Sequence, residues 1–237
     1  MSNFAPEQVP EAPLSNTTTE DSPTRAVLHT AVIETQYLPP LETFARLLAY
    51  PRVRFEAHEH WVKRSYRNRT HVAGPSGLLV MSIPLVRRGG DRRLSGQVRI
   101  SYAQPWLREH WNTLVAGYRR SPFFEYYEDR FEPLFNAEYE RLIDRNTALF
   151  QFFAEALEWS VDLGQTEYWD ARVPMGCVDF RNAVMPAGGR PDPFYRAPEY
   201  GQVFGARHSF LPGLSIADLL FNEGPASREV LLKAIGY

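Results

Sequence analysis

Cysteine is almost absent from this sequence: Cys177 is the single one among 237 residues. One cysteine cannot form an intramolecular disulfide, and it excludes a cysteine-rich zinc site. A chain without disulfides is typical of a reducing compartment, so we expect a cytoplasmic location. A nucleophilic cysteine needs a neighbouring base to form its thiolate, and no local signature of that kind surrounds Cys177.

Long apolar runs and a strong excess of charge are also lacking. No apolar run approaches the ~20 residues of a membrane-spanning helix, and the N-terminus lacks the basic-then-apolar order of a secretory signal. The 26 Lys and Arg residues nearly balance the 28 Asp and Glu residues, which gives a formal net charge of −2. Nucleic-acid binding usually requires a strong basic excess. We therefore expect no nucleic-acid partner and no membrane span.

Motifs of several enzyme classes are missing as well. The sequence contains no Gly-rich nucleotide motif, no nucleophile-elbow serine motif and no His-Glu-x-x-His motif, so we predict no cofactor. The composition, with 44% hydrophobic and 23% charged residues, is ordinary for a globular protein. The chain is long enough to bury a sizeable core.

The N-terminal part of the chain predicts a tail followed by parallel strands. Residues 1–25 are rich in Pro, Ser, Thr and acid, which predicts a disordered tail; residues 26–237 are expected to form a single domain. The apolar, β-branched stretch 26–34 predicts a buried strand. A helical stripe over 41–50 and a strand over 53–58 follow, and this order favours parallel pairing of the two strands.

The rest of the chain changes from strands to helices. Residues 65–74 and 77–86 predict a hairpin, and 97–102 a further strand. Residues 171–213 are rich in Gly and Pro and read as a long loop. We predict an α+β fold, in which a mixed β-sheet from the N-terminal half is packed by helices from the middle and the C-terminus. Helices are expected within 105–120, 123–135, 139–159 and 215–235, and a strand near 160–168.

The segment from Glu56 to Arg69, EAHEHWVKRSYRNR, is poor material for a hydrophobic core, because unpaired buried charge is costly. Glu56, His58 and His60 alternate, so on a strand they would share one face. Two histidines and a carboxylate can begin a zinc or iron site. A metal-free acid–base cluster and a solvated strand face are the alternatives.

The second half of this segment is rich in arginine. Lys63, Arg67 and Arg69 share one parity, and Arg64 lies on the other. The planar fork of arginine suits phosphate or carboxylate, and Asn68 can donate and accept at once. These side chains predict a pocket for a phosphate-bearing ligand. The alternative is a hairpin edge that is protected by charge.

Two further polar residues stand in apolar helical patterns. His110 lies one turn beyond Trp106, so it projects into a site or is a hydrogen-bonded core histidine. Asp218 falls within LSIADLLF, where it is a buried partner for an arginine or a helix-surface residue. We favour the buried partner. Ser215 is expected to cap this helix.

Several separated motifs carry a resemblance to a known family. TQYLPPLETFARL, HWVKRSYRNR, LLVMSIPLV, PWLREHWNTLVAGYRRSPFFEYYEDRFEPLF and YGQVF…FLPGLSIADLLFNEGP occur in this order. Together they resemble the WbqC-like family over roughly residues 30–230. The genes of members of that family are often found near surface-polysaccharide or natural-product genes. Gln36 here follows Thr35, where many members have His, which is a departure from the pattern.

The resemblance implies a function in cell-surface polysaccharide biosynthesis of the O-antigen type. We expect an enzyme that transfers an acyl or aminoacyl group to an activated sugar. A non-catalytic module that binds a sugar nucleotide or a partner is the first alternative. A metal-dependent hydrolase built on Glu56, His58 and His60 is the second.

The expected enzyme assigns roles to particular residues. His58, Glu59 or His110 is the predicted general base, which would deprotonate an attacking amine or hydroxyl. The expected partner is a phosphate-bearing small molecule, either a sugar nucleotide or an acyl thioester. The predicted ligand-binding residues are Gln36, Lys63, Asn68, Arg69, Tyr118, Tyr200 and Asp218.

Overall fold

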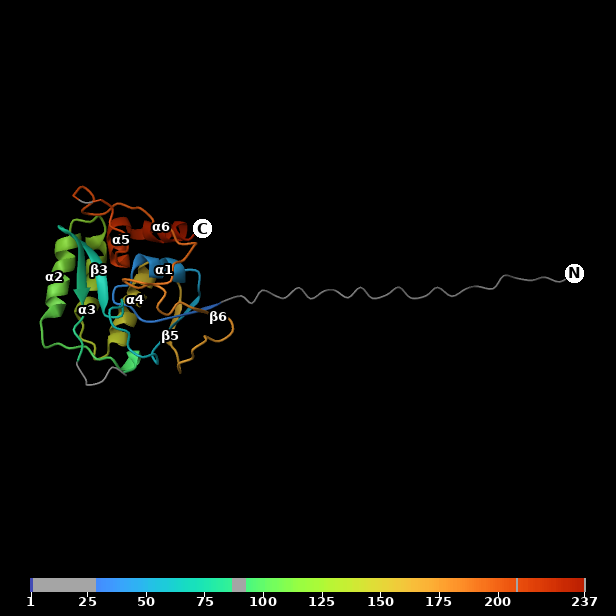
Figure 1. Cartoon of the computed structure of the whole chain (residues 1–237). Helices are drawn as coiled ribbons and strands as arrows, with labels where there is room; N and C mark the ends of the chain where they lie inside the picture. The colour runs from blue at the N-terminus through green and yellow to red at the C-terminus, as the bar shows by residue number, and fades with distance from the viewer. Residues whose placement is uncertain (2–28, 87–92, 208, 237) are drawn as a thin grey trace.

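The computed structural model describes Met1 and residues 29–86, 93–207 and 209–236 (Figure 1). The predicted tail, residues 1–25, lies outside the described residues except for Met1. Two sheets and six α-helices make up the described part. No helix among these residues has the length and apolar content needed to cross a membrane.

Four short strands form a parallel sheet in the order β5-β2-β1-β6. The predicted parallel pairing of the first two strands is confirmed, with Thr30 opposite Arg52 and Ile33 opposite Phe55. The two outer strands come from the part of the chain beyond the long helices. The strands are β1 (Thr30–Ile33), β2 (Arg52–Phe55), β5 (Asp162–Gln165) and β6 (Cys177–Asp179).

The predicted hairpin is confirmed as a separate antiparallel pair, β3 (Arg69–Gly74) and β4 (Gly77–Ser82). Its turn requires glycine, because Gly77 has a φ of +108°, a region that other residues rarely adopt. The predicted α+β class is thereby confirmed. The parallel and antiparallel pairings are divided between two sheets.

The helices form where the apolar spacing predicts them. The N-cap prediction is also confirmed, because Ser215 Oγ accepts a hydrogen bond from the backbone N–H of Ala217 at 3.1 Å. Short 3₁₀ turns occur at 95–97 and 224–226. The α-helices are α1 (Leu41–Leu47), α2 (Trp106–Tyr118), α3 (Phe124–Asn136), α4 (Leu142–Ala156), α5 (Ile216–Glu223) and α6 (Ser227–Ala234).

Two of the predicted strands and one predicted loop differ from the structure. The strand predicted over 53–58 ends at Phe55. The segment 97–102, which was predicted to be a strand, forms only isolated bridges. Ile100 pairs with Leu85 and Arg99 pairs with Arg141, so the segment has no continuous partner strand. The loop predicted over 171–213 contains β6, whose three residues are too few to produce a periodic pattern.

Aromatic rings join the helices to one face of the parallel sheet. Phe44 of α1 stacks on Phe150 of α4 at a centroid distance of 4.6 Å. Phe55 of β2 meets the same Phe150 edge-on at 5.2 Å. Each fully buried ring of this size contributes roughly 1.5–3 kcal/mol through apolar burial. Val32 and Arg54, on the opposite face, line a cavity together with residues 165–168 at and after the end of β5.

Candidate functional site

The carboxyl ends of the parallel strands bring polar residues from distant parts of the chain together. Glu34 follows β1, Glu56 follows β2, Thr166 follows β5, and Arg181 lies two residues beyond β6. Backbone hydrogen bonds continue the strand ladder here, from Glu56 N–H to the Ile33 carbonyl (2.8 Å) and from Thr166 N–H to the Phe55 carbonyl (3.0 Å). Parallel sheets commonly bind ligands at this edge.

A buried ion-pair cluster centres on Arg67. Its Nε and Nη2 donate to Glu59 Oε1 at 2.8 and 2.6 Å. Nη2 also donates to Asn182 Oδ1 at 2.9 Å and lies 3.8 Å from Glu34 Oε2. All three charged side chains are almost completely buried. The cluster therefore holds two carboxylates and one guanidinium away from water.

Burial governs the chemistry of this cluster. It raises the pKa of Glu59, while the charge of Arg67 opposes the rise and the charge of Glu34 adds to it. Nη1 of Arg67 is buried and has no hydrogen-bond partner among the described residues. A buried donor without a partner costs folding free energy, so this cluster lowers the stability of the fold relative to a fully hydrogen-bonded one.

Gln36 belongs to this same cluster. Its Nε2 donates to Glu34 Oε1 at 2.8 Å, and its Oε1 accepts from Thr43 Oγ1 at 2.7 Å. The backbone N–H of Asn182 donates to the other oxygen of Glu34 at 2.8 Å. The predicted ligand-binding residue Gln36 is thus buried and fixes the orientation of Glu34.

Glu56 anchors a second, adjoining set of contacts. Its Oε2 accepts from Arg181 Nη1 at 3.0 Å, and its Oε1 accepts from Thr166 Oγ1 at 2.8 Å. Arg181 also pairs with Asp179 at 2.8 Å. The hydrogen bond to Arg181 and the charge of that guanidinium hold the pKa of Asp179 below its usual value against the opposing effect of burial.

His58 is half-buried beside these residues. Its backbone N–H donates to Glu56 Oε1 at 2.9 Å, and its Nε2 lies 3.0 Å from the Thr166 carbonyl oxygen. A carbonyl oxygen only accepts, so Nε2 must carry the proton. In the neutral ring, Nδ1 is then the atom with a free lone pair. The fold thus orients the ring of a predicted general base.

A cavity of about 270 Å³ lies over the face of the parallel sheet that carries Thr30, Val32 and Arg54. It extends past the carboxyl ends of the strands to Glu56 and Thr166. Carboxylates, hydroxyls, an amide and two guanidinium groups line it, together with the ring of Tyr168, which is 63% exposed. We call it the sheet-edge pocket. Its lining consists of Thr30, Val32, Arg54, Glu56, Gln165, Thr166, Glu167, Tyr168, Asp170, Val173, Pro174, Cys177 and Arg181.

His110 lies in a different, buried network. Tyr37 Oη is 3.0 Å from its Nδ1, and Trp106 meets its ring edge-on at 5.2 Å. Arg145 is completely buried nearby, with rings of Tyr37, Trp106 and Phe135 around its guanidinium. Burial, and secondarily the charge of Arg145, lowers the pKa of His110 to about 4. His110 is therefore neutral near pH 7, in a setting that fits the predicted alternative of a core histidine.

Tyr118, Tyr200 and Asp218 meet in a third network. Tyr200 Oη donates to Asp218 Oδ2 at 2.6 Å, and the Ala73 N–H donates to Tyr118 Oη at 3.0 Å. Asp218 is completely buried, as favoured from the sequence, but its partner is a tyrosine hydroxyl and not an arginine. Burial raises the pKa of Asp218 to about 6, although the hydrogen bond from Tyr200 opposes the rise.

Replacing Asp218 with asparagine is expected to change how stability depends on pH. A carboxyl whose pKa rises from 3.8 to about 6 on folding binds protons more tightly in the folded state. Stability therefore falls as pH rises from about 4 to above 6, by about 3 kcal/mol in total. Urea unfolding of the wild type and Asp218→Asn at pH 4 and 7.5 should show this loss only in the wild type.

The exposed carboxylate Asp129 on α3 provides the matched control. Asp129→Asn should leave the wild-type pH dependence in place. Parallel stability curves for the wild type and Asp218→Asn would contradict the raised pKa of Asp218.

The three residues predicted to bind a phosphate-bearing ligand have different surroundings. Lys63 is exposed, and Arg69 begins β3 and is partly buried. Asn68 Nδ2 donates to the Ile83 carbonyl at 2.9 Å, which ties the start of the hairpin together. The shared strand face predicted for Lys63, Arg67 and Arg69 is wrong, because β3 begins only at Arg69 and Arg67 is buried.

The shared strand face predicted for Glu56, His58 and His60 is also wrong. β2 ends at Phe55, and each of these side chains has different surroundings. His60 is exposed, while Glu56 is buried against Arg181. Within 29–86, 93–207 and 209–236, no group of three or more His, Cys, Asp or Glu side chains could hold a metal ion.

Sequence reasoning missed most of the residues at the carboxyl ends of the parallel strands. Glu34, Thr166, Tyr168 and Arg181 were not singled out from the sequence. One signal was available, because Glu34 directly follows an apolar strand. Polar residues at such positions gather at one edge of a parallel sheet. The other residues depend on β5 and β6, whose pairing partners the sequence does not identify.

Comparison with known families identifies the family of this chain. A family model described as the WbqC-like protein family matches residues 35–173, which is more than half of the chain. The matched part contains Gln36, His58 and His110, and it ends before Arg181. Comparisons with curated proteins and with solved structures returned no match.

Proposed function

Because this chain belongs to the WbqC-like protein family, which is associated with polysaccharide biosynthesis, we propose that it is an enzyme of cell-surface polysaccharide assembly. The proposed reaction transfers an acyl or aminoacyl group to an activated sugar of an O-antigen-type polysaccharide. We place the reaction in the cytoplasm, as the single cysteine predicts. The donor is proposed to be an acyl thioester.

The sheet-edge pocket is the observation that carries this proposal. Its carboxylates accept hydrogen bonds from sugar hydroxyls, and its amide and hydroxyl groups both donate and accept. The exposed ring of Tyr168 offers an apolar face to one side of a sugar ring. A volume of about 270 Å³ lies just below the range of roughly 300–1,000 Å³ for drug-sized ligands. The pocket thus suits one sugar ring.

His58 is proposed as the general base. Its Nδ1 would take the proton of an acceptor hydroxyl or amine on the sugar. The acceptor atom then bonds to the acyl carbon, the thioester C–S bond breaks, and the departing thiolate takes the proton from the imidazolium. Glu59 is already paired with Arg67, and His110 is buried against Tyr37. These pairings favour His58 among the three predicted bases.

The remaining predicted ligand contacts are kept in the proposal. Lys63, Asn68 and Arg69 stay the predicted contacts for the phosphate-bearing part of a substrate. The Asn68 amide already donates to Ile83, so its contribution would come through its side-chain oxygen. Tyr118, Tyr200 and Asp218 stay predicted ligand-binding residues, although their network is separate from the sheet-edge pocket.

A non-catalytic binding module is the second candidate. Both guanidinium groups of the pocket are already paired: Arg54 with Asp162 at 2.7 Å, and Arg181 with Glu56 at 3.0 Å. Such pairing favours a rigid recognition surface, since no charge in these pairs is left free for chemistry. Product formation separates the two candidates.

Cys177 allows a direct test, because it lines the pocket and is the single cysteine of the chain. A sugar nucleotide at ten times its Kd should slow alkylation of Cys177 about tenfold, since only the free protein reacts. The measurement is intact-protein mass spectrometry against time. A nucleoside diphosphate without sugar serves as the control ligand and should protect less.

The same samples test for catalysis when acyl-thioester donors are added. A sugar product heavier by one acyl group supports the proposed enzyme. Protection of Cys177 without any product, across a broad set of donors, supports the binding module. If no sugar nucleotide protects Cys177, the sheet-edge pocket is not the sugar site.

A further inference from the structure

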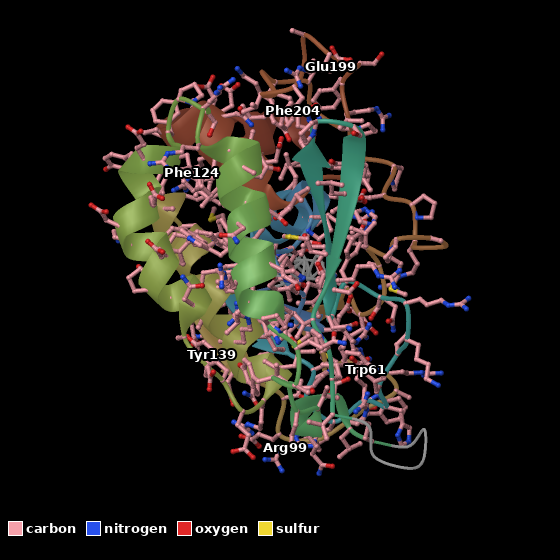
Figure 2. All side chains as sticks on the ribbon, turned by 90° about the vertical axis from the view of Figure 1, so that its left-hand side faces the viewer. Trp61, Arg99, Phe124, Tyr139, Glu199 and Phe204 are labelled. Atoms are coloured by element: carbon pink, nitrogen blue, oxygen red, sulfur yellow. The ribbon has the colours of Figure 1, made fainter. Side chains whose placement is uncertain are left out.

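A second hollow lies away from the sheet-edge pocket, where α2 ends against residues 200–207. It consists of two adjoining cavities of about 500 and 360 Å³. Figure 2 shows Phe204 above the upper ends of α2 and the hairpin. Among the described residues, none lines both this hollow and the sheet-edge pocket. The two cavities share Arg120, Val203, Phe204 and Arg207, and we call them together the arginine groove.

Three arginines line the groove. Arg119, Arg120 and Arg207 are exposed, and within the part of the chain that the structure describes none of their guanidinium groups makes an ion pair or hydrogen bond. The lining contains one carboxylate, Glu223, whose Oε1 accepts from the Gly201 N–H at 3.1 Å. The groove is therefore positively charged and has unused donors.

Helix capping accounts for only part of this arrangement. Cations near the C-terminal end of a helix are favourable, which would explain Arg119 and Arg120 next to α2. It does not explain Arg207, which a distant loop brings to the same cavities. Like charges repel when they gather on one surface. A bound anion would offset this repulsion through charge-assisted hydrogen bonds.

The loop that carries Arg207 is held in place. Gln202 Nε2 donates to the Leu211 carbonyl at 2.9 Å, and Gln202 Oε1 accepts from the Leu211 N–H at 2.9 Å. On the facing wall, Asn222 Nδ2 donates to the Asp218 carbonyl at 2.7 Å. These bonds fix the side chains of Gln202 and Asn222 in the lining before any ligand arrives, and preorganised sites lose less entropy on binding.

The shape and apolar content of the groove indicate the ligand. Phe204 and Val203 offer an apolar surface between the arginines. Each cavity is within the range of roughly 300–1,000 Å³ that suits small organic ligands. We propose that the arginine groove binds an organic diphosphate, with the phosphates on Arg120 and Arg207 and the attached group against Phe204. This site is independent of the proposed function, since it shares no residue with the sheet-edge pocket.

The test is calorimetric titration of the full chain with uridine diphosphate and with inorganic pyrophosphate. Arg120→Gln and Arg207→Gln should each weaken binding about 10- to 100-fold, as expected when one charge-assisted contact is lost. Glu223→Gln should tighten binding, because it removes the opposing charge. Arg130→Gln is the matched control, since Arg130 is an exposed arginine on α3 that pairs with Glu155. It should bind as the wild type does.

A third arm distinguishes a nucleotide from a lipid as the source of the diphosphate. It uses vesicles that contain an isoprenyl diphosphate in neutral lipid. Binding of either ligand, with the same loss in Arg120→Gln, supports the diphosphate site and identifies its source. Thermal unfolding of each variant verifies the fold. Equal affinity in the wild type, Arg120→Gln and Arg207→Gln would overturn the proposal, as would the absence of binding in every arm.

Discussion

Replacement of His58 by glutamine is expected to slow the proposed transfer reaction by about 100- to 10,000-fold, the usual contribution of a general base. Glutamine retains a side-chain N–H that can donate to the Thr166 carbonyl, the acceptor now facing His58 Nε2 at 3.0 Å. It has no basic lone pair to take the proton of the acceptor group. The loss should therefore appear in kcat while the sugar still protects Cys177 from alkylation.

His60→Gln makes the same chemical change two residues away, on an exposed side chain. Neither histidine is among the lining residues of the pocket, but His58 contacts the lining residues Glu56 and Thr166. Turnover of the His60→Gln variant should match the wild type. Turnover in His58→Gln above one third of the wild-type value would remove His58 from the mechanism and return attention to Glu59 and His110. Equal losses in both histidine variants would indicate a general effect on this segment.

The helical part of the fold could be predicted because its apolar spacing is regular. The stripe from Leu142 to Ala156 is long, and burial of one face follows directly from it. The pairing of β1 with β2 was also predictable, since a single short helix separates two apolar strands. The loop containing β6 gave no such pattern. β6 is a strand only because it pairs with β1, and the pairing residues are far apart in the sequence.

The site was harder to predict because strand parity fails once a strand has ended. β2 ends at Phe55, so the alternation of Glu56, His58 and His60 does not place them on one face. Arg67 was expected on a ligand-binding face and is instead buried between carboxylates. Its partner Asn182 lies more than a hundred residues further along the chain, and no local pattern announces that contact.

Replacement of Arg67 by methionine is expected to lower the free energy of unfolding by about 3–5 kcal/mol, the cost of breaking a buried ion pair from one side. The variant would leave Glu59 and Glu34 buried, at 6% and 1% exposure, without the guanidinium between them. Urea unfolding at pH 7 measures the loss. Arg69→Met, at the partly buried start of β3, is the control and should cost less.

The pH dependence of this loss identifies its cause. Burial raises the pKa of Glu59 and Arg67 opposes the rise, so the pKa rises further in Arg67→Met. A carboxyl with a raised pKa destabilises the fold as pH increases, so the loss should be smaller near pH 4 than at pH 7. A pH-independent loss would attribute the effect to packing and not to charge.

The double variant Glu59→Leu/Arg67→Met separates charge pairing from side-chain volume. Buried ion pairs replaced on both sides by apolar residues are often neutral in stability, so most of the single-variant loss should be recovered. Glu34 would keep its bonds from Gln36 and the Asn182 N–H. The single variants Arg67→Met and Glu59→Leu provide the comparison. If their separate losses of stability simply added in the double variant, the two residues would be uncoupled, contrary to the 2.6 Å contact between them. Recovery would mean that Arg67 serves to compensate Glu59.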